Sequence, residues 1–179
     1  ILALKKSVKE VTKVEIILEE SPVGDHQANG EIENAIKRFS GQFRTLREAL
    51  ETRYQRRITP EHHALPWLIN YSSGCINRYQ VGADGKTSHR KWKGKDFDRA
   101  IPEFGECILA LKLDSAGKAK SKVRWFEAIF LGVREETGEL IVGTPEGVIK
   151  ARDFHRHGAD AERWNCLLYT SDAADDANC

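Results

Sequence analysis

The chain has 179 residues, of which 31% are charged and 40% hydrophobic, and its formal net charge is +1. This composition is typical of a globular protein with one core or two small ones, and it excludes a largely disordered chain. The apolar runs are far too short to cross a bilayer, so we expect no membrane partner and an intracellular location. Because the sequence lacks methionine and starts at Ile1, we expect it to be a segment of a longer protein.

Cysteine and histidine spacing gives no sign of a metal site. The four cysteines lie too far apart for a CxxC knuckle, and reduced thiols are expected. The pairs His62-His63 and His155-x-His157 lack a second ligand pair at zinc-finger spacing, so we predict no zinc site.

In the first third of the chain the sequence predicts a helix, a strand, a loop and a long helix, in that order. Apolar spacing predicts a short helix over 3–11, and β-branched residues predict a strand over 14–18. A turn-rich loop over 22–30 leads into a helix over 30–54, with Asn29 as a candidate N-cap. Its apolar positions recur at steps of three and four and predict one stripe facing a core: Ile32, Ala35, Ile36, Phe39, Phe43, Leu46 and Leu50.

The middle of the chain holds a second helix and a basic segment. Apolar residues from Leu65 to Tyr79 predict a helix that ends before the turn-prone stretch 82–85. The densest basic run of the chain, 86–95, follows within a predicted linker over 83–102.

Beyond residue 103 the pattern changes to short β-type runs. Strands are predicted at 107–113, 123–132, 140–143 and 148–154, with a lysine-rich loop at 114–122 and a tight turn at 144–147. We predict that these strands close into a small barrel, because an open sheet of this size would leave the backbone groups of its edge strands unpaired.

The last fourteen residues, 166–179, break from this pattern. They contain three Asp and neither Lys nor Arg, and they resemble the translation of a sequencing-library adaptor. We expect this tail to be non-native and without a fold of its own. A genuine acidic tail is the alternative.

The loop before the long helix resembles the third acidic motif of retroelement integrases, in which Asn-Gly and two further residues precede the catalytic Glu. Asn29, Gly30 and Glu33 fall on these positions. Downstream, a series of small motifs keeps the order seen after the integrase core in copia-type retrotransposon polyproteins: Asn77-Arg78, Gly85-Lys86-Thr87, Trp92-Lys93-Gly94-Lys95, Phe104-Gly105, Arg124-Trp125, Ile129-Phe130-Leu131-Gly132 and Val142-Gly143-Thr144-Pro145. The resemblance covers roughly 13–165, and it departs from the family at Thr87-Ser88-His89, where Thr-Pro-Tyr is usual.

The resemblance implies an α/β fragment of an RNase H-like integrase core over 1–82, followed by a small SH3-like all-β barrel over 103–165. Glu33 would be the third catalytic carboxylate and a ligand of two Mg²⁺ (or Mn²⁺) ions, which activate the attacking hydroxyl and stabilise the leaving oxygen. Asp25 is the alternative acid. A first-turn Glu that only complements the helix dipole is the structural alternative.

The same resemblance implies DNA as the partner, both the ends of the element and its target. Lys37 and Arg44 follow Glu33 along one side of the helix and are candidate phosphate contacts. Lys91, Lys93 and Lys95 flank Trp92 and could bind phosphates while the indole stacks on a base. The alternatives are a Glu33–Lys37 surface pair and a solvated linker.

The chain is therefore interpreted as a fragment of a retrotransposon integrase that lacks two of three catalytic carboxylates and is limited to nucleic-acid binding. The parent would be nuclear and homo-oligomeric. The alternatives are a non-catalytic nucleic-acid or protein interaction module from a decayed element, and a chain with no selected function. Further Asp residues in an upstream reading frame would favour the integrase.

Overall fold

The structure is a computed structural model, and it describes residues 30–112 and 124–165. The chain divides into two compact units, residues 1–37 and 38–179, and each is described by itself. The predictions for 3–11, 14–18, 114–122 and 166–179 lie outside the described residues. Among the helices that are described, none has both the length and the apolar character that crossing a membrane would require.

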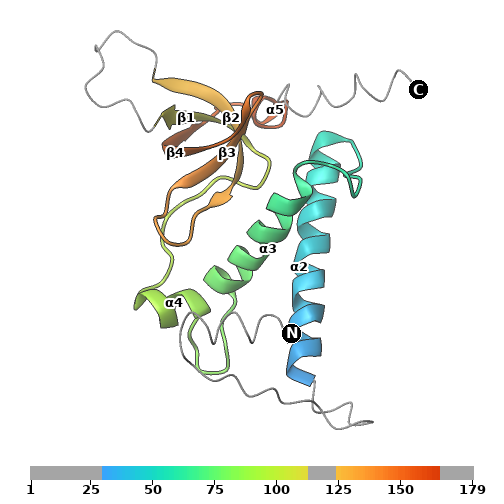
Figure 1. The fold of residues 1–179 in the computed structure, drawn as a ribbon, viewed down its shortest axis with the longest axis vertical. Coiled ribbons are helices and arrows are strands. Elements are labelled where there is room, and N and C mark those ends of the chain that lie inside the picture. Colours follow the sequence, from blue (N-terminus) through green and yellow to red (C-terminus); the bar gives the residue numbers. More distant parts are fainter. Residues whose placement is uncertain (1–29, 113–123, 166–179) are drawn as a thin grey trace, which may run out of the picture. The chain divides into compact units, whose positions relative to one another are not determined.

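Helix α2 spans Gly30–Tyr54, which confirms the long helix predicted from apolar spacing (Figure 1). It ends where Gln55 adopts a left-handed conformation with φ of 53°. Phe43, Leu46 and Leu50 pack into a core. The prediction that the whole stripe faces a core is wrong at its start, because Ile32 and Ile36 are 62% and 58% exposed.

Helix α3 spans Leu65–Tyr79, again as predicted, with a proline in its first turn, where the missing N–H costs least. The connection from α2 is fixed by Glu51, whose carboxylate accepts hydrogen bonds from the Ile58 N–H and from Arg47 Nε, both at 2.9 Å. These bonds hold the pKa of Glu51 below its usual range, the Ile58 N–H contributing most. A short helix, α4, spans Ser88–Lys93.

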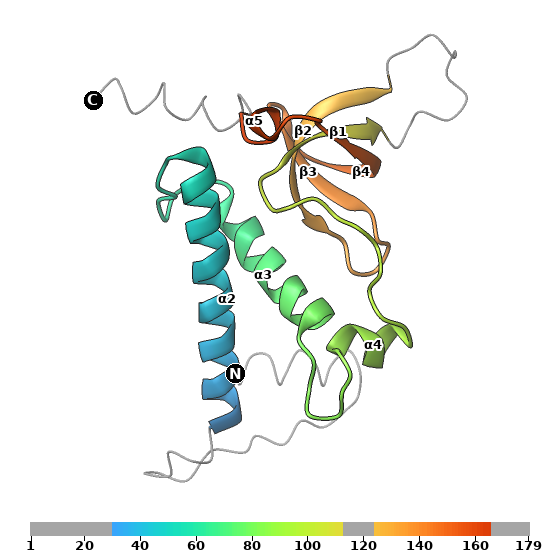
Figure 2. The same ribbon diagram turned by 180° about the vertical axis from the view of Figure 1, so that it is seen from behind.

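Four consecutive antiparallel strands close into a barrel, as the turn spacing predicted (Figures 1 and 2). They are β1 Cys107–Lys112, β2 Trp125–Val133, β3 Leu140–Thr144 and β4 Gly147–Arg156, and β4 pairs with β1 to complete the closure. The predicted tight turn is confirmed, since Thr144 pairs with Gly147 and its hydroxyl donates to the Gly147 carbonyl at 2.8 Å. A single turn of helix, α5 Asp160–Arg163, follows the barrel.

The second unit has two hydrophobic cores, one on each face of the barrel wall. The barrel core fills the interior with Ile108, Ala110, Ala128, Phe130, Val133, Leu140, Val142 and Ala151. The shared core lies between the helices and the outside of the barrel: Leu50, Ile58, Ala64, Leu68, Phe104, Cys107, Ile129 and Leu131. Cys107 and Ile129 are paired across β1 and β2, so they lie on the same face of the sheet. The fold is therefore a mixture of helices and a four-stranded antiparallel barrel joined by a common core.

Candidate nucleic-acid interface

The predicted metal ligand Glu33 lies in the first turn of α2 with an exposed side chain. Its motif neighbour Asn29 and the alternative acid Asp25 fall outside the described residues. Within 30–112 and 124–165, no three His, Cys, Asp or Glu side chains lie close enough together to hold a metal ion. The described part of the chain thus adds no second ligand to Glu33, and its role at Mg²⁺ or Mn²⁺ stays a prediction.

The two predicted phosphate contacts on α2 are both exposed. Lys37 lies one turn after Glu33 in the first unit, and no ion pair joins the two side chains. The alternative of a Glu33–Lys37 surface pair is therefore not realised. Arg44, in the second unit, donates from Nε to the Ser40 carbonyl at 3.2 Å and keeps its charge in solvent.

Residues 88–93 of the basic run 86–95 form helix α4, where the sequence predicted only a linker over 83–102. Thr87 caps its start by accepting a hydrogen bond from the Arg90 N–H at 3.1 Å. Gly94 ends it in a left-handed conformation, φ 77°, with its N–H donating to the Arg90 carbonyl at 2.9 Å. Both ends of the helix are thus determined by local residues, and none of its residues is buried.

Acidic residues neutralise only part of this run. Arg90 pairs with Asp96 and Lys91 with Asp84, each at 3.1 Å between nitrogen and oxygen. The hydrogen bond from Lys91 is the largest cause lowering the pKa of Asp84. Within the described ranges Lys86, Lys93 and Lys95 form no ion pair, so these three charges remain available to an anionic ligand.

Trp92 lies between these cations and is 60% exposed. The ammonium of Lys93 is 3.8 Å from the centroid of its ring, a cation–π contact. Trp92 contributes to neither core. Trp67, by contrast, packs against the shared core, and Trp125 lies against the His155 ring with a centroid distance of 4.2 Å.

Aromatic contacts tie the segment after α4 to the end of α3. Phe97 meets the rings of Tyr79 and His89 edge-on, with centroid distances of 6.0 and 5.4 Å. The Arg78 guanidinium lies 4.9 Å from the centroid of the same ring. Helix α4 is therefore placed on the protein by contacts that do not require Lys93, Lys95 or Trp92.

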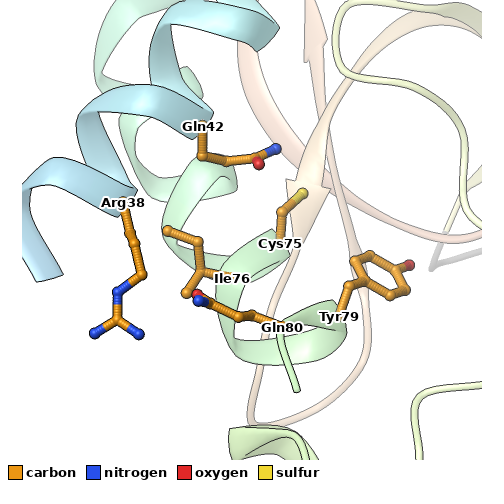
Figure 3. A pocket seen from close by; sticks show the side chains of 6 residues that line it. All are labelled: Arg38, Gln42, Cys75, Ile76, Tyr79 and Gln80. Carbon is orange, nitrogen blue, oxygen red and sulfur yellow. The ribbon is translucent and has the colours of Figure 1, made fainter. Parts of the chain in front are cut away.

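A cavity of about 400 Å³ lies between α2 and the end of α3 (Figure 3). Its described lining residues are Arg38 and Gln42 from α2, Cys75, Ile76 and Tyr79 from α3, and Gln80 directly after α3. Burial is the main cause that raises the pKa of the Cys75 thiol, so the thiol stays protonated at neutral pH and is a poor nucleophile. Among the described residues, the lining of this cavity includes no carboxylate.

An ion pair with one buried member joins α3 to the segment after β2 and was missed in the sequence. The Arg78 side chain, 2% exposed, approaches Glu135 Oε1 at 2.6 Å and donates to the Val133 carbonyl at 3.3 Å, while its Nε lies buried without a hydrogen-bond partner. A smaller cavity of about 190 Å³ adjoins this pair. No local signal could reveal it, because Arg78 and Glu135 are 57 positions apart.

A buried carboxylate, Glu106, lies immediately before β1 with 2% of its side chain exposed. Its Oε2 accepts a hydrogen bond from the Glu103 N–H at 2.8 Å, and Oε1 is 3.2 Å from Arg156 Nε and 3.9 Å from Arg163 Nε. These contacts connect the ends of β1, β4 and α5. Glu106 thus has a structural role at this end of the barrel.

No protein-family model matches the chain, and neither a curated protein nor a solved structure matches it. The surface described above is consequently judged by its own charges, exposure and contacts.

Proposed function

We propose that the chain is the C-terminal part of a copia-type retrotransposon integrase, and that the described part binds nucleic acid. In this proposal 1–82 complete an RNase H-like core and 103–165 form an SH3-like barrel. Glu33 supplies one of three carboxylates, so two Mg²⁺ (or Mn²⁺) ions are held only when the other two are present. The parent then joins element ends to target DNA in the nucleus as a homo-oligomer.

Two features of the fold support this proposal. The Asn29-Gly30-x-x-Glu33 motif leads directly into α2, so a helix holds the direction of the Glu33 side chain. The four barrel strands follow in simple antiparallel order and close upon themselves, as small SH3-like barrels do.

The observation that carries the binding function is the set of cations on and beside α4. Lys86, Lys93 and Lys95 have exposed side chains, have no acidic partner among the described residues, and lie within ten positions of one another. Neutralising three phosphates gives weak binding that is indifferent to sequence and falls steeply as salt rises.

The test is the salt dependence of DNA binding by the whole chain. A duplex is titrated by fluorescence anisotropy at several salt concentrations, with wild type and with the triple variant Lys86→Gln, Lys93→Gln, Lys95→Gln. We expect the slope of log K against log[salt] to flatten by up to about 3, close to one for each lost phosphate contact.

The matched control removes three exposed cations of the barrel: Arg124→Gln, Lys150→Gln and Arg152→Gln. An equal loss of slope in both triples would mean that net charge and not the α4 run binds DNA. An unchanged slope in the α4 triple would move the interface elsewhere, with Lys37 and Arg44 as the next candidates.

Strand transfer separates the integrase from a non-catalytic interaction module. The chain is extended with its upstream reading frame, and joining of a labelled element end to plasmid DNA is measured with Mg²⁺ or Mn²⁺. Joining that depends on Glu33 supports the integrase. DNA binding without joining in an intact frame supports the module.

A further inference from the structure

Trp92 presents an aromatic surface that the fold does not use. Burying a tryptophan contributes strongly to a core or an interface, so an indole left 60% exposed loses that stabilisation in the free protein. Within the described part of the chain, no other aromatic ring stacks on Trp92, and its one ring contact is the ammonium of Lys93 at 3.8 Å. The indole is thus available to a ligand with a flat apolar face.

The residues around Trp92 are cationic. Arg90, Lys91, Lys93 and Lys95 all lie within three positions of it, and only the first two are paired with acids. A protein partner would fit this surface poorly, because the centres of protein interfaces are depleted in lysine. A strand of nucleic acid supplies both a flat base and flanking phosphates, so charge complementarity favours a polyanion.

We propose that α4 binds single-stranded DNA, with one unpaired base stacked on the Trp92 indole and the adjacent phosphates neutralised by Lys93 and Lys95. This inference rests on the proposed function, in which the same run binds nucleic acid. It adds that the preferred substrate is unpaired.

Duplex DNA cannot make the stacking contact without opening. Its bases are stacked on one another and offer only their edges in the grooves, and extruding one requires unpairing and unstacking it. The lysines can contact phosphates of either form. Trp92 should therefore contribute to the binding of single strands and not of duplexes, whereas the lysines contribute to both.

Helix α4 holds the indole and the cations in a fixed relation. Thr87 and Gly94 define both ends of the helix, and Phe97 attaches the following segment to Tyr79 and His89. A site ordered before binding loses less conformational entropy when the strand is bound. Since the shared core and the barrel core do not include Trp92, replacing it leaves the fold intact.

The experiment compares two DNA probes on the full chain: a labelled oligothymidylate of about 12 nucleotides, a length that one small site covers, and a hairpin in which every stem base is paired. An oligouridylate of the same length is the RNA control. Binding is followed by anisotropy at one low salt concentration. The variants are Trp92→Ala, Trp92→Phe and Trp92→Leu. The last retains apolar bulk without an aromatic face, and Ile149→Ala serves as an exposed apolar control on the barrel. Thermal unfolding confirms that each variant is folded.

We expect Trp92→Ala and Trp92→Leu to weaken oligothymidylate binding about fivefold or more, the lower end of what one base–aromatic stack contributes. Hairpin binding should change by less than about twofold, since its phosphate contacts remain. Trp92→Phe should retain most of the affinity for the single strand, and Ile149→Ala should change neither probe.

Any of four results would overturn the inference. Equal losses on both probes, or no loss on either, would mean that the indole does not stack on a base. An oligouridylate bound tenfold more tightly than oligothymidylate would mean that the strand is RNA. Salt-sensitive DNA binding that ignores Trp92 would leave the proposed function standing, whereas no binding to any probe would remove both.

Discussion

The ion pair between Arg78 and Glu135 predicts an unequal effect of removing its two members. Arg78 is 2% exposed and Glu135 is 33% exposed, with 2.6 Å between Nη2 and Oε1. Glu135→Ala leaves a buried guanidinium with the Val133 carbonyl as its remaining hydrogen-bond partner. Arg78→Met removes the buried charge itself, fills similar space with an apolar chain, and leaves a carboxylate that water can reach.

The magnitudes follow from the cost of an uncompensated buried charge. Removing one partner of a fully buried pair costs about 3–5 kcal/mol, and the partial exposure of Glu135 places Glu135→Ala nearer to about 2–3 kcal/mol. Arg78→Met should cost about 1 kcal/mol, mainly for the hydrogen bond to Val133 and the contact with Phe97. The double variant should resemble Arg78→Met, because no charge is then left unpaired in the interior.

Urea unfolding followed by circular dichroism measures these differences. With a slope of about 1–3 kcal/mol per molar urea, a gap of 1 kcal/mol or more shifts the midpoint measurably. Glu136→Ala is the matched control, because Glu136 is adjacent, exposed and paired with Arg134 at the surface, and it should not alter the midpoint. If Arg78→Met were the more destabilising change by about 1 kcal/mol, the pair would be a net source of stability and the reasoning would fail.

Three further results are expected at acidic and thiol groups. Glu33→Gln should change the free energy of unfolding of the chain by less than about 1 kcal/mol. In an extended parent the same substitution should abolish Mg²⁺-dependent strand transfer, and full transfer would refute the metal role of Glu33. Because the folded state lowers the pKa of Glu51 below its usual 4.5, Glu51 stabilises the fold above that pH and this contribution is lost as pH falls. The melting-temperature difference between wild type and Glu51→Gln should thus shrink between about pH 6 and pH 3, with Glu48→Gln as control. Burial raises the pKa of the Cys75 thiol, so peptide-resolved alkylation at pH 8 should be slower at Cys75 than for a model thiol.

Elements with a strong local pattern were predictable. The apolar spacing of α2 and α3 and the alternation and turns of the four strands each specify their own element, and the barrel follows from the need to cover strand edges. Helix α4 was missed although Thr87 and Gly94 are good cap residues, because six residues give no hydrophobic period to detect.

Features that depend on distant residues could not be read from the sequence. Ile32 and Ile36 belong to the same apolar stripe as Leu50, yet of these three only Leu50 is buried. Periodicity indicates which face of a helix is apolar, but it does not indicate which residues cover that face. The exposure of Trp92 and the pairing of Lys91 with Asp84 likewise depend on how α4 is placed. The candidate residues on α4 were predictable as a basic run, but not which of their charges remain unpaired.

The shared core has a consequence for where the chain can be divided. Cys107 and Ile129 lie on the outside of the barrel, yet are only 4% and 5% exposed because the helices cover them. A barrel transferred to another protein without α3 would carry this apolar face into solvent, where it would promote aggregation. The unit that can be moved intact is therefore larger than the barrel, and a fusion that keeps it folded must join the chains upstream of the helices that cover it.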